Sequence, residues 1–251
     1  MRSDLSAIIP RVGWFPANVH AFSTTRTGGV SHTPYDAGNG QAGLNLGDHV
    51  GDDPKSVALN RDILNKCLPT PVNFLSQVHG MRVVDASGIV GNPAADGSFA
   101  TKKGVVCAVL TADCLPVLFS NASGTVVAAA HAGWRGLASG ILQETVRAMR
   151  ESAGDEIFAW MGPAIGPAQF EVGSDVLEAF SQFSASECFT PGKASGKYLA
   201  DIYSLAKHAL AQAGVFQVIG GEHCTFSEAD KFYSYRRDGT TGRMASVIWM
   251  D

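Results

Sequence analysis

The sequence lacks any long apolar run. No stretch approaches the roughly 18 uninterrupted apolar residues that a membrane-spanning helix needs, and the first residues hold no apolar signal-peptide core. We therefore expect a cytoplasmic protein without a membrane partner. A basic excess is also missing, because the net charge is -4. That charge argues against nucleic acid as a partner. Disorder is not indicated either, since 45% of the 251 residues are hydrophobic.

Closely spaced cysteines are also absent. The chain has five cysteines, and none forms the C-x2-C pair that is typical of a small structural zinc site. In a reducing compartment, scattered cysteines of odd number are more often buried side chains than disulfides. Any metal site must therefore draw its ligands from distant parts of the chain, which requires a folded scaffold.

The apolar runs that are present predict a single domain over residues 1–251 with an α/β fold, in which mixed sheets are flanked by helices. Asp53 and Pro54 carry the sequence signature of a helix start. Pro116 has no backbone N–H, so we expect an edge or a bulge there. Residues 74–79 and 81–85 suggest a hairpin or a bulged pair of strands. Buried strands are expected over residues 105–110, 115–119, 125–130 and 156–161. Further helices are expected from near residue 137 and over residues 174–183 and 201–213.

Three residues of metal-ligand type stand at the ends of apolar runs, each with a glycine or proline within two residues. They are His79, Cys114 and His131, with 34 and then 16 residues between them. Thiolate and imidazole are usual zinc ligands, and three of them leave a fourth position open, as in catalytic zinc sites. The wide spacing favours a catalytic site over a structural one.

Two other interpretations use the same residues. Cys114 is a nucleophile if His131 acts as its base. In the simplest case, a buried cysteine and a hydrogen-bonded histidine have no chemical role. Spacing alone does not choose between the metal site, the nucleophile pair and the purely structural interpretation.

Two places in the sequence suggest that an anion binds. The segment after His131 passes through Gly133 into an expected helix, so free backbone amides and the side chain of Arg135 would face a ligand there. Arg26 precedes a Gly-Gly loop and suits phosphate or carboxylate. A tight turn with a solvated arginine explains Arg26 equally well.

Seven motifs follow one another in order from about residue 20 to the C-terminus. They are Thr25–Ser31, Ser76–Gly80, Thr111–Pro116, His131–Gly136, Gly162–Gly166, Phe232–Arg237 and Gly242–Met244. Together they resemble the YfiH-like, laccase-domain family. The resemblance implies a single-domain α/β fold with zinc on His79, Cys114 and His131.

The family resemblance implies a zinc-dependent purine nucleoside phosphorylase that cleaves adenosine, inosine, guanosine or methylthioadenosine, with adenosine deaminase activity besides. Other labels in the family are polyphenol oxidase and cysteine hydrolase, and some bacterial members are linked to removing wrongly built peptidoglycan precursors. We discount the oxidase label, because a four-copper enzyme needs more histidines than the seven present, many as His-x-His pairs, and this chain has none. Copper remains possible at the same ligands in vitro. The usual deaminase motif, H-x-E with P-C-x-x-C, is missing.

The residue roles that we expect follow from this resemblance. Cys114, His131 and Arg26 are the expected catalytic residues. Phosphate would be bound by Arg26, Arg135 and the amide after Gly133.

Two further roles concern neighbours of the site. Asp113 would orient a histidine ligand, and Phe232 or Tyr233 would stack on the purine. The expected partners are a nucleoside and phosphate, and the chain is expected to be a monomer or weak homodimer. A cysteine hydrolase or amidase acting on a peptide-like or peptidoglycan-precursor bond is the rival function, and a non-enzymatic scaffold is the third.

Overall fold

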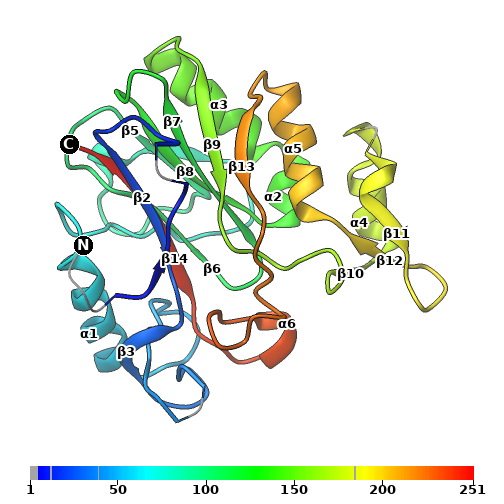
Figure 1. Ribbon diagram of the computed structural model, residues 1–251, viewed down its shortest axis with the longest axis horizontal. Helices are drawn as coiled ribbons and strands as arrows, with labels where there is room; N and C mark the ends of the chain where they lie inside the picture. The colour runs from blue at the N-terminus through cyan, green and yellow to red at the C-terminus, as the bar shows by residue number, and fades with distance from the viewer. Residues whose placement is uncertain (1–4, 12, 39, 184) are drawn as a thin grey trace.

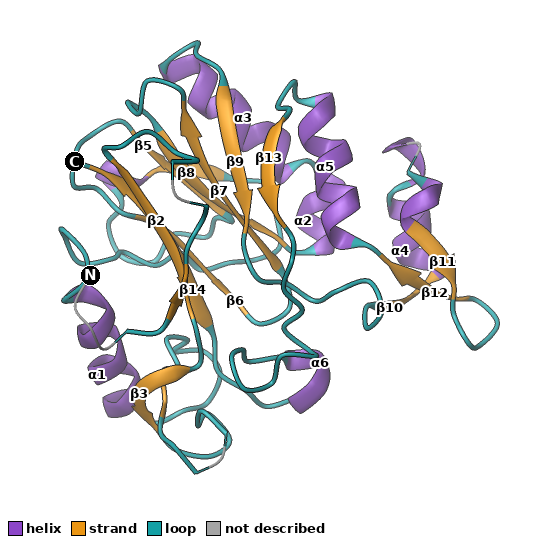
Figure 2. Ribbon diagram, viewed as in Figure 1, coloured by secondary structure: helices purple, strands orange, loops and turns teal. Residues whose placement is uncertain are grey.

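The computed structural model describes residues 5–11, 13–38, 40–183 and 185–251. Two sheets packed face to face form its centre, and helices cover both outer faces (Figures 1 and 2). Within the described residues, no helix has the length and apolar character needed to span a bilayer. This arrangement confirms the mixed α/β fold expected from the sequence. The expected domain of residues 1–251 also includes positions 1–4, 12, 39 and 184, which lie outside the described residues.

The larger sheet has six strands in the order β13-β9-β7-β8-β5-β4. The inner pairs β9-β7, β7-β8 and β8-β5 are antiparallel, while β13-β9 and β5-β4 are parallel. The mixture explains why strands occur both in runs and between helices along the chain. The bounds are β4 Val83–Asp85, β5 Gly97–Ala100, β7 Leu115–Asn121, β8 Val127–Ala132, β9 Ile157–Met161 and β13 Gln217–Gly220.

The second sheet has four antiparallel strands in the order β1-β2-β14-β6. A small three-stranded sheet, β10-β12-β11, projects to one side of the molecule (Figure 1). The strand bounds are β1 Ala7–Ile8, β2 Val19–Thr24, β3 Thr27–Ser31, β6 Cys107–Thr111, β10 Glu171–Gly173, β11 Phe189–Pro191, β12 Lys197–Ala200 and β14 Met244–Met250. The helices are α1 Pro54–Asn65, α2 Trp134–Ser139, α3 Ile141–Ser152, α4 Ser174–Ala179, α5 Ile202–Gln212 and α6 Tyr235–Asp238, with short 3-10 turns at Ala86–Gly88, Ser181–Phe183 and Ser186–Cys188.

The layers follow from the alternation of side chains along each strand. In β7, Leu115, Val117 and Phe119 pack in the core beneath helices α3 and α5, while Leu118 packs between the two sheets. In β6 and β14, one set of alternate residues likewise faces the larger sheet and the other set lies in the core that includes residues of α1. Strands buried on both faces read as continuous apolar runs, as the sequence of β7 does.

The first helix begins where the sequence predicts. Asp53 accepts hydrogen bonds from the amides of Lys55 and Ser56, and Pro54 occupies the first helical position. The helix expected over residues 201–213 is also confirmed, with Asp201 as its N-cap.

Two local expectations were wrong. β7 is a central strand, not an edge, and it tolerates Pro116 because its pairing with β9 begins one residue later, at Val117. The carbonyl of Pro116 still accepts a hydrogen bond from Gly162. The expected hairpin of residues 74–85 does not form. Its first half is loop with one isolated bridge at Ser76, and β4 pairs in parallel with β5.

Candidate metal centre

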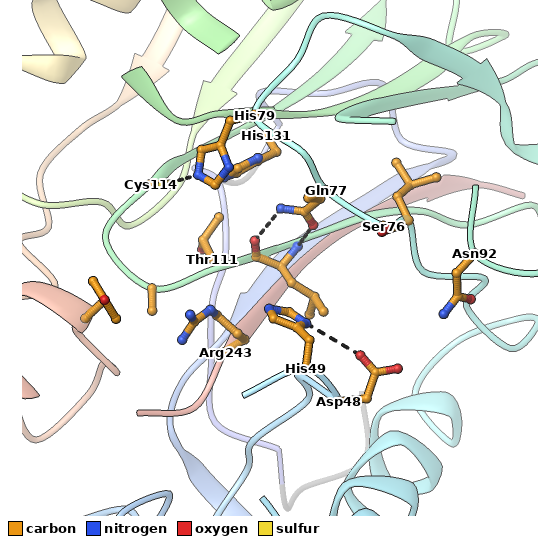
Figure 3. Close-up of a pocket in the computed structure, with 14 residues that line it drawn as sticks. Asp48, His49, Ser76, Gln77, His79, Asn92, Thr111, Cys114, His131 and Arg243 are labelled. Atoms are coloured by element: carbon orange, nitrogen blue, oxygen red, sulfur yellow. Dashed lines mark hydrogen bonds and ion pairs between the residues drawn. The ribbon is translucent and has the colours of Figure 1, made fainter. Parts of the chain in front are cut away.

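The side chains of His79, Cys114 and His131 converge at one end of the larger sheet (Figure 3). One ligand atom from each lies within 4.8 Å of the other two. Cys114 directly precedes β7 and His131 lies in β8, and the register pairs Pro116 with His131. Antiparallel pairing therefore brings the cysteine and the second histidine together. Figure 3 shows His79 reaching the same point from a separate loop, and its Nε2 lies 3.8 Å from the Cys114 sulfur.

Asp96 holds the loop that carries His79. Its carboxylate, which is fully buried, accepts hydrogen bonds from the backbone amides of Val78 (3.1 Å), His79 (2.9 Å) and Gly80 (2.8 Å). These bonds support a strained backbone, because His79 has a φ of 59°. Left-handed φ values are uncommon for residues other than glycine and cluster at functional sites.

The same carboxylate fixes the ring of His131. Nδ1 of His131 donates to Oδ1 of Asp96 at 2.8 Å, which leaves Nε2 as the nitrogen free to bind a metal. Burial would lower the pKa of His131, but the bonds to Asp96 and Cys114 outweigh it and raise the pKa to about 9. Burial opposes ionisation of Asp96 as well, yet its hydrogen bonds hold the pKa of that carboxyl below the usual value.

The environment of Cys114 favours the thiolate. Burial raises the pKa of Cys114, but the neighbouring imidazoles of His131 and His79 have a larger, opposite effect and lower the pKa to about 6. The thiolate is the form of cysteine that binds metals and also the form that attacks electrophiles. Electrostatics alone therefore fits a metal ligand and a nucleophile equally well.

Gly133 lets the three ligands come together. A Cβ at this position would lie 2.8 Å from Cδ2 of His79 and 3.1 Å from the sulfur of Cys114. Gly133 also precedes α2, but that helix has only six residues before Gly140 breaks it from α3. The long helix expected after residue 137 is thus two helices, and the clearer contribution of Gly133 is the space it leaves.

A large pocket of about 640 Å³ opens beside the three ligands. Figure 3 shows Arg243, Thr111 and His49 along it, below the ligands in that view. Gln77 supports one wall, because its side-chain amide donates to the carbonyl of Leu110 (2.8 Å) and accepts from its amide (2.7 Å). The side chain of Gln77 thereby completes the edge of β6.

A second pocket of about 230 Å³ reaches the ligands from another direction. Its walls are mainly aromatic and aliphatic, with Trp134 and Phe170 among them, and Arg135 and Arg236 stand at its border. Both pockets are lined by His79, Cys114 and Tyr235. Tyr235, 61% exposed at the start of α6, forms a wall of each. The candidate metal centre thus lies where two cavities meet.

Comparisons with known proteins identify the family. The sequence pattern described as "Multi-copper polyphenol oxidoreductase laccase" matches residues 20–251. The chain belongs to this family. "Purine nucleoside phosphorylase YfiH" of Escherichia coli (strain K12) is 51% identical over 238 residues, 94% of this chain and 95% of that protein. A "Purine nucleoside phosphorylase" of Haemophilus influenzae is 48% identical over 241 residues, with coverage of 94% and 96%.

Solved structures support the same relationship. The crystal structure of Neisseria meningitidis protein NMB0706 has a TM-score of 0.90 and 49% sequence identity, covering 99% of this chain and all of that one. YlmD from Geobacillus stearothermophilus, 31% identical, has a TM-score of 0.87 and covers the whole of this chain. The fold of the described residues is therefore that of the family.

The three ligands fit a single zinc ion. With metal–ligand bonds of about 2.0–2.3 Å, neighbouring ligand atoms in a tetrahedral site lie about 3.5 Å apart. The separation of 3.8 Å between the Cys114 sulfur and Nε2 of His79 is close to this value. Three ligand atoms suit one ion, not the several coppers that the family's description implies.

A second group of ligand-type residues differs in its chemistry. Glu187, Cys188 and His208 also bring ligand atoms within 4.8 Å of one another. Burial raises the pKa of the Cys188 thiol to about 11, which disfavours the thiolate. Glu187 and His208 already satisfy each other at 2.9 Å near the surface. We interpret this group as an ion pair beside a buried cysteine.

Arg26 lies elsewhere than the sequence suggested. The residue is 7% exposed, and its guanidinium donates hydrogen bonds to the carbonyls of Asp36 and Ala229. It is not among the residues that line either pocket at the ligands. The arginine thus ties the β2–β3 corner to neighbouring loops, whereas Arg135 does stand at the border of the second pocket.

Asp113 has other partners than the histidine we expected. Its carboxylate accepts hydrogen bonds from the hydroxyl of Thr225 and from the amide of Arg236, both at 2.6 Å. It thereby anchors the beginning of α6, which carries Tyr235. The residue that hydrogen-bonds the ring of His131 is Asp96. Asp113 itself has a φ of 87°, the second non-glycine residue with positive φ among those described.

The aromatic residues expected to stack on a purine are buried. Phe232 and Tyr233 are both 0% exposed, and Phe232 packs against the ring of His223. The Tyr233 hydroxyl donates to the carbonyl of Tyr35. Neither offers a ring face to a ligand in this structure, whereas their neighbour Tyr235 does border both pockets.

Sequence reasoning missed Asp96, Arg243 and Tyr235 as site residues. Asp96 precedes a glycine, and that pair looks like ordinary turn chemistry. Arg243 and Tyr235 belong to motifs that carried the family resemblance, so that signal was present in the sequence. Their side chains reach the site only through α6 and the start of β14, which local patterns do not reveal.

Proposed function

We propose that this protein is a zinc-dependent purine nucleoside phosphorylase that accepts adenosine, inosine, guanosine and methylthioadenosine and also deaminates adenosine. The observation that carries the proposal is the convergence of His79, Cys114 and His131 at the junction of two cavities. Family members about half identical to this chain and named purine nucleoside phosphorylases support the reaction class.

His79, Cys114 and His131 would hold the zinc ion. When bound, zinc supplies Lewis acidity, which stabilises negative charge on an oxygen and lowers the pKa of water to about 7. Asp96 keeps His131 in the tautomer that presents Nε2, and it fixes the backbone of His79. A ligand set held this rigidly requires little reorganisation when substrate binds.

The remaining parts of the site match a reaction of two substrates. The two cavities that meet at His79 and Cys114 offer separate space for two substrates, and arginine side chains stand at both of them. Of the residues expected from the sequence to bind phosphate, Arg135 borders the second pocket, whereas Arg26 borders neither. During cleavage, the protein must hold the two substrates in the correct relative orientation and exclude water from the ribose carbon.

Product analysis tests the proposal directly. Purified protein of known metal content is incubated with adenosine, with and without inorganic phosphate. Phosphate-dependent release of adenine together with ribose 1-phosphate supports phosphorolysis. Inosine formed without phosphate supports deamination, and hypoxanthine shows that both reactions occur in sequence. No purine product from metal-loaded protein under any of these conditions overturns the proposal.

The cysteine hydrolase keeps one observation in its favour. The lowered pKa of Cys114 beside a protonated His131 is also the arrangement of a cysteine nucleophile and its partner. The related proteins named above do not favour that function. Metal analysis combined with thiol alkylation, described in the Discussion, separates the two.

A further inference from the structure

Arg243 occupies an unusual electrostatic position in the larger pocket. It directly precedes β14, and Figure 3 shows its guanidinium beside Thr111 and His49, facing the cavity that leads to Cys114. Its main chain is fixed on both sides, because its amide donates to Asn45 (2.9 Å) and its carbonyl accepts from Leu46 (3.1 Å). The guanidinium is therefore presented to the pocket from a rigid support.

This charge forms no direct ion pair among the described residues. Nη1 donates to the carbonyls of Thr241 (3.1 Å) and Gly242 (3.0 Å), and none of the ion pairs found in the described parts of the chain includes Arg243. Asp48, the carboxylate of the same pocket, faces Arg61 at 3.2 Å and His49 at 3.5 Å. Arg243 is half-buried, and burial lowers its pKa although the neighbouring Cys114 and Asp113 favour the charged form.

A partly buried cation without a direct ion-pair partner is energetically unfavourable, and a bound anion relieves that cost. A guanidinium also presents donors in a fixed fork that matches two oxygens of a phosphate. Purine nucleosides are neutral, so phosphate is the anionic substrate of the proposed reaction. The free donors of Arg243 are therefore better suited to phosphate than to the nucleoside.

The second pocket has the opposite character. Trp134 and Phe170 give it aromatic walls, and Ile165 and Ile202 close it with apolar surface. Flat, apolar surroundings of this kind suit a heterocyclic base. Tyr235 borders both cavities, and the guanidinium of Arg243 lies 6.0 Å from the centre of its ring.

We propose that Arg243 binds the phosphate substrate in the larger pocket, while the purine base lies in the aromatic pocket beside Trp134, on the other side of Tyr235. The assignment rests on the proposed phosphorylase function and specifies its substrate sites.

An oxygen of phosphate then forms a bond to C1′ of the ribose as the bond from C1′ to N9 breaks. The electron pair of that bond goes to the purine, which takes a proton from solvent, and ribose 1-phosphate is the second product. Attack and departure on opposite faces of C1′ match two cavities that meet at the ligands.

Steady-state kinetics of the metal-loaded protein, with inosine and inorganic phosphate varied in turn, test the assignment. For Arg243→Gln we expect KM for phosphate to rise about tenfold or more, as the loss of a charged hydrogen-bonding group implies. KM for inosine should stay within about twofold. Arg243→Lys keeps the charge but not the forked arrangement of donors, so its KM for phosphate should lie between those of the wild type and Arg243→Gln. This variant serves as the test if Arg243→Gln does not fold. Trp134→Leu should show the reverse pattern, with KM for inosine raised.

Direct binding of inorganic phosphate, measured by calorimetry, separates this site from the function on which it rests. If the wild-type protein binds phosphate through Arg243 but does not cleave nucleosides, the phosphorylase is wrong and the anion site stands. If the enzyme cleaves inosine with phosphate and Arg243→Gln leaves KM for phosphate unchanged, the assignment is wrong and the function stands. A rise in KM for phosphate in Arg135→Gln but not in Arg243→Gln places the anion in the aromatic pocket and also overturns it. Arg147→Gln, on the exposed face of α3, is the unchanged control.

Discussion

Oδ1 of Asp96 lies 2.8 Å from Nδ1 of His131, and both side chains are almost fully buried. The same carboxylate accepts hydrogen bonds from the backbone amides of Val78, His79 and Gly80, which surround the strained backbone of His79. The Asp96 side chain thus orients His131 through its ring and His79 through its backbone. It holds together two parts of the chain that β-sheet pairing does not join. The candidate metal centre therefore depends on a residue that touches no metal.

Asp96→Asn tests this dependence. An amide keeps the size of the side chain, but its nitrogen cannot accept the hydrogen bonds that the second oxygen accepts. Because residues that orient metal ligands affect affinity strongly, we expect zinc affinity to fall by about 10- to 100-fold. Competition with a chelating dye measures it. Asp85→Asn, at an exposed turn, is the matched control, and equal affinity in both variants would show that Asp96 does not support the site.

The sequence predicts local features of this fold well. The start of α1 follows from Asp53 and Pro54, whose capping role depends only on neighbouring amides. The apolar run of β7 predicts a buried strand, because both of its faces pack against other layers. The ligand types of His79, Cys114 and His131 are also visible in the sequence. The structure brings them together, as a metal site would require.

Features that depend on distant contacts could not be predicted in the same way. Pro116 suggests an edge strand until the register shows that pairing with β9 starts at Val117. Asp96 reads as a turn residue, and its role appears only when residues 78–80 and His131 are placed around it. Asp113 and Arg26 are chemically suited to the roles expected of them, but tertiary contacts give both side chains other partners. The structure therefore adds the residues that position the site.

Gly133→Ala should weaken metal binding without unfolding the protein. The backbone of Gly133 has a φ of -58°, which alanine adopts readily, so the effect comes from the added Cβ. That atom would lie 2.8 Å from His79 and would push it or Cys114 away from the shared point. We expect zinc affinity to fall by about tenfold or more, as for other displaced ligands.

The matched control for this substitution is Gly154→Ala. A Cβ at Gly154 meets nothing within 4 Å, so its free energy of unfolding should change by no more than about 0.5 kcal/mol. Metal titration and thermal unfolding of both variants are compared. Unchanged zinc affinity in Gly133→Ala would mean that the ligands have more room than the structure shows.

Asp113→Asn should affect substrate binding and leave the metal in place. Asparagine tolerates the left-handed backbone of this position, but its amide nitrogen cannot accept from Thr225 or from the amide of Arg236. The start of α6 then loses an anchor, and Tyr235 is no longer held as firmly between the pockets. We expect KM for inosine to rise by about tenfold, the effect of one charged hydrogen bond, while bound zinc stays the same.

Steady-state kinetics and metal analysis on one preparation check this pair of results. Asp238→Asn, at the far end of α6 and exposed, should leave KM unchanged. Loss of zinc in Asp113→Asn would mean that Asp113 orients a metal ligand, the role that the structure gives to Asp96.

Removal of the metal distinguishes the proposed phosphorylase from a cysteine hydrolase. With zinc bound, the thiolate of Cys114 is engaged and should react slowly with an alkylating reagent. After treatment with a chelator, we expect nucleoside cleavage to be lost and Cys114 to react at least about tenfold faster, since a free thiolate is the reactive species. Added zinc should restore activity if the chelated protein has not been alkylated.

Peptide mass spectrometry locates the label, and the buried thiols of Cys107 and Cys188 serve as internal controls. A protein purified without metal that is inactivated by alkylation alone would instead support the cysteine hydrolase, because its catalysis would then depend on the thiol and not on a bound ion.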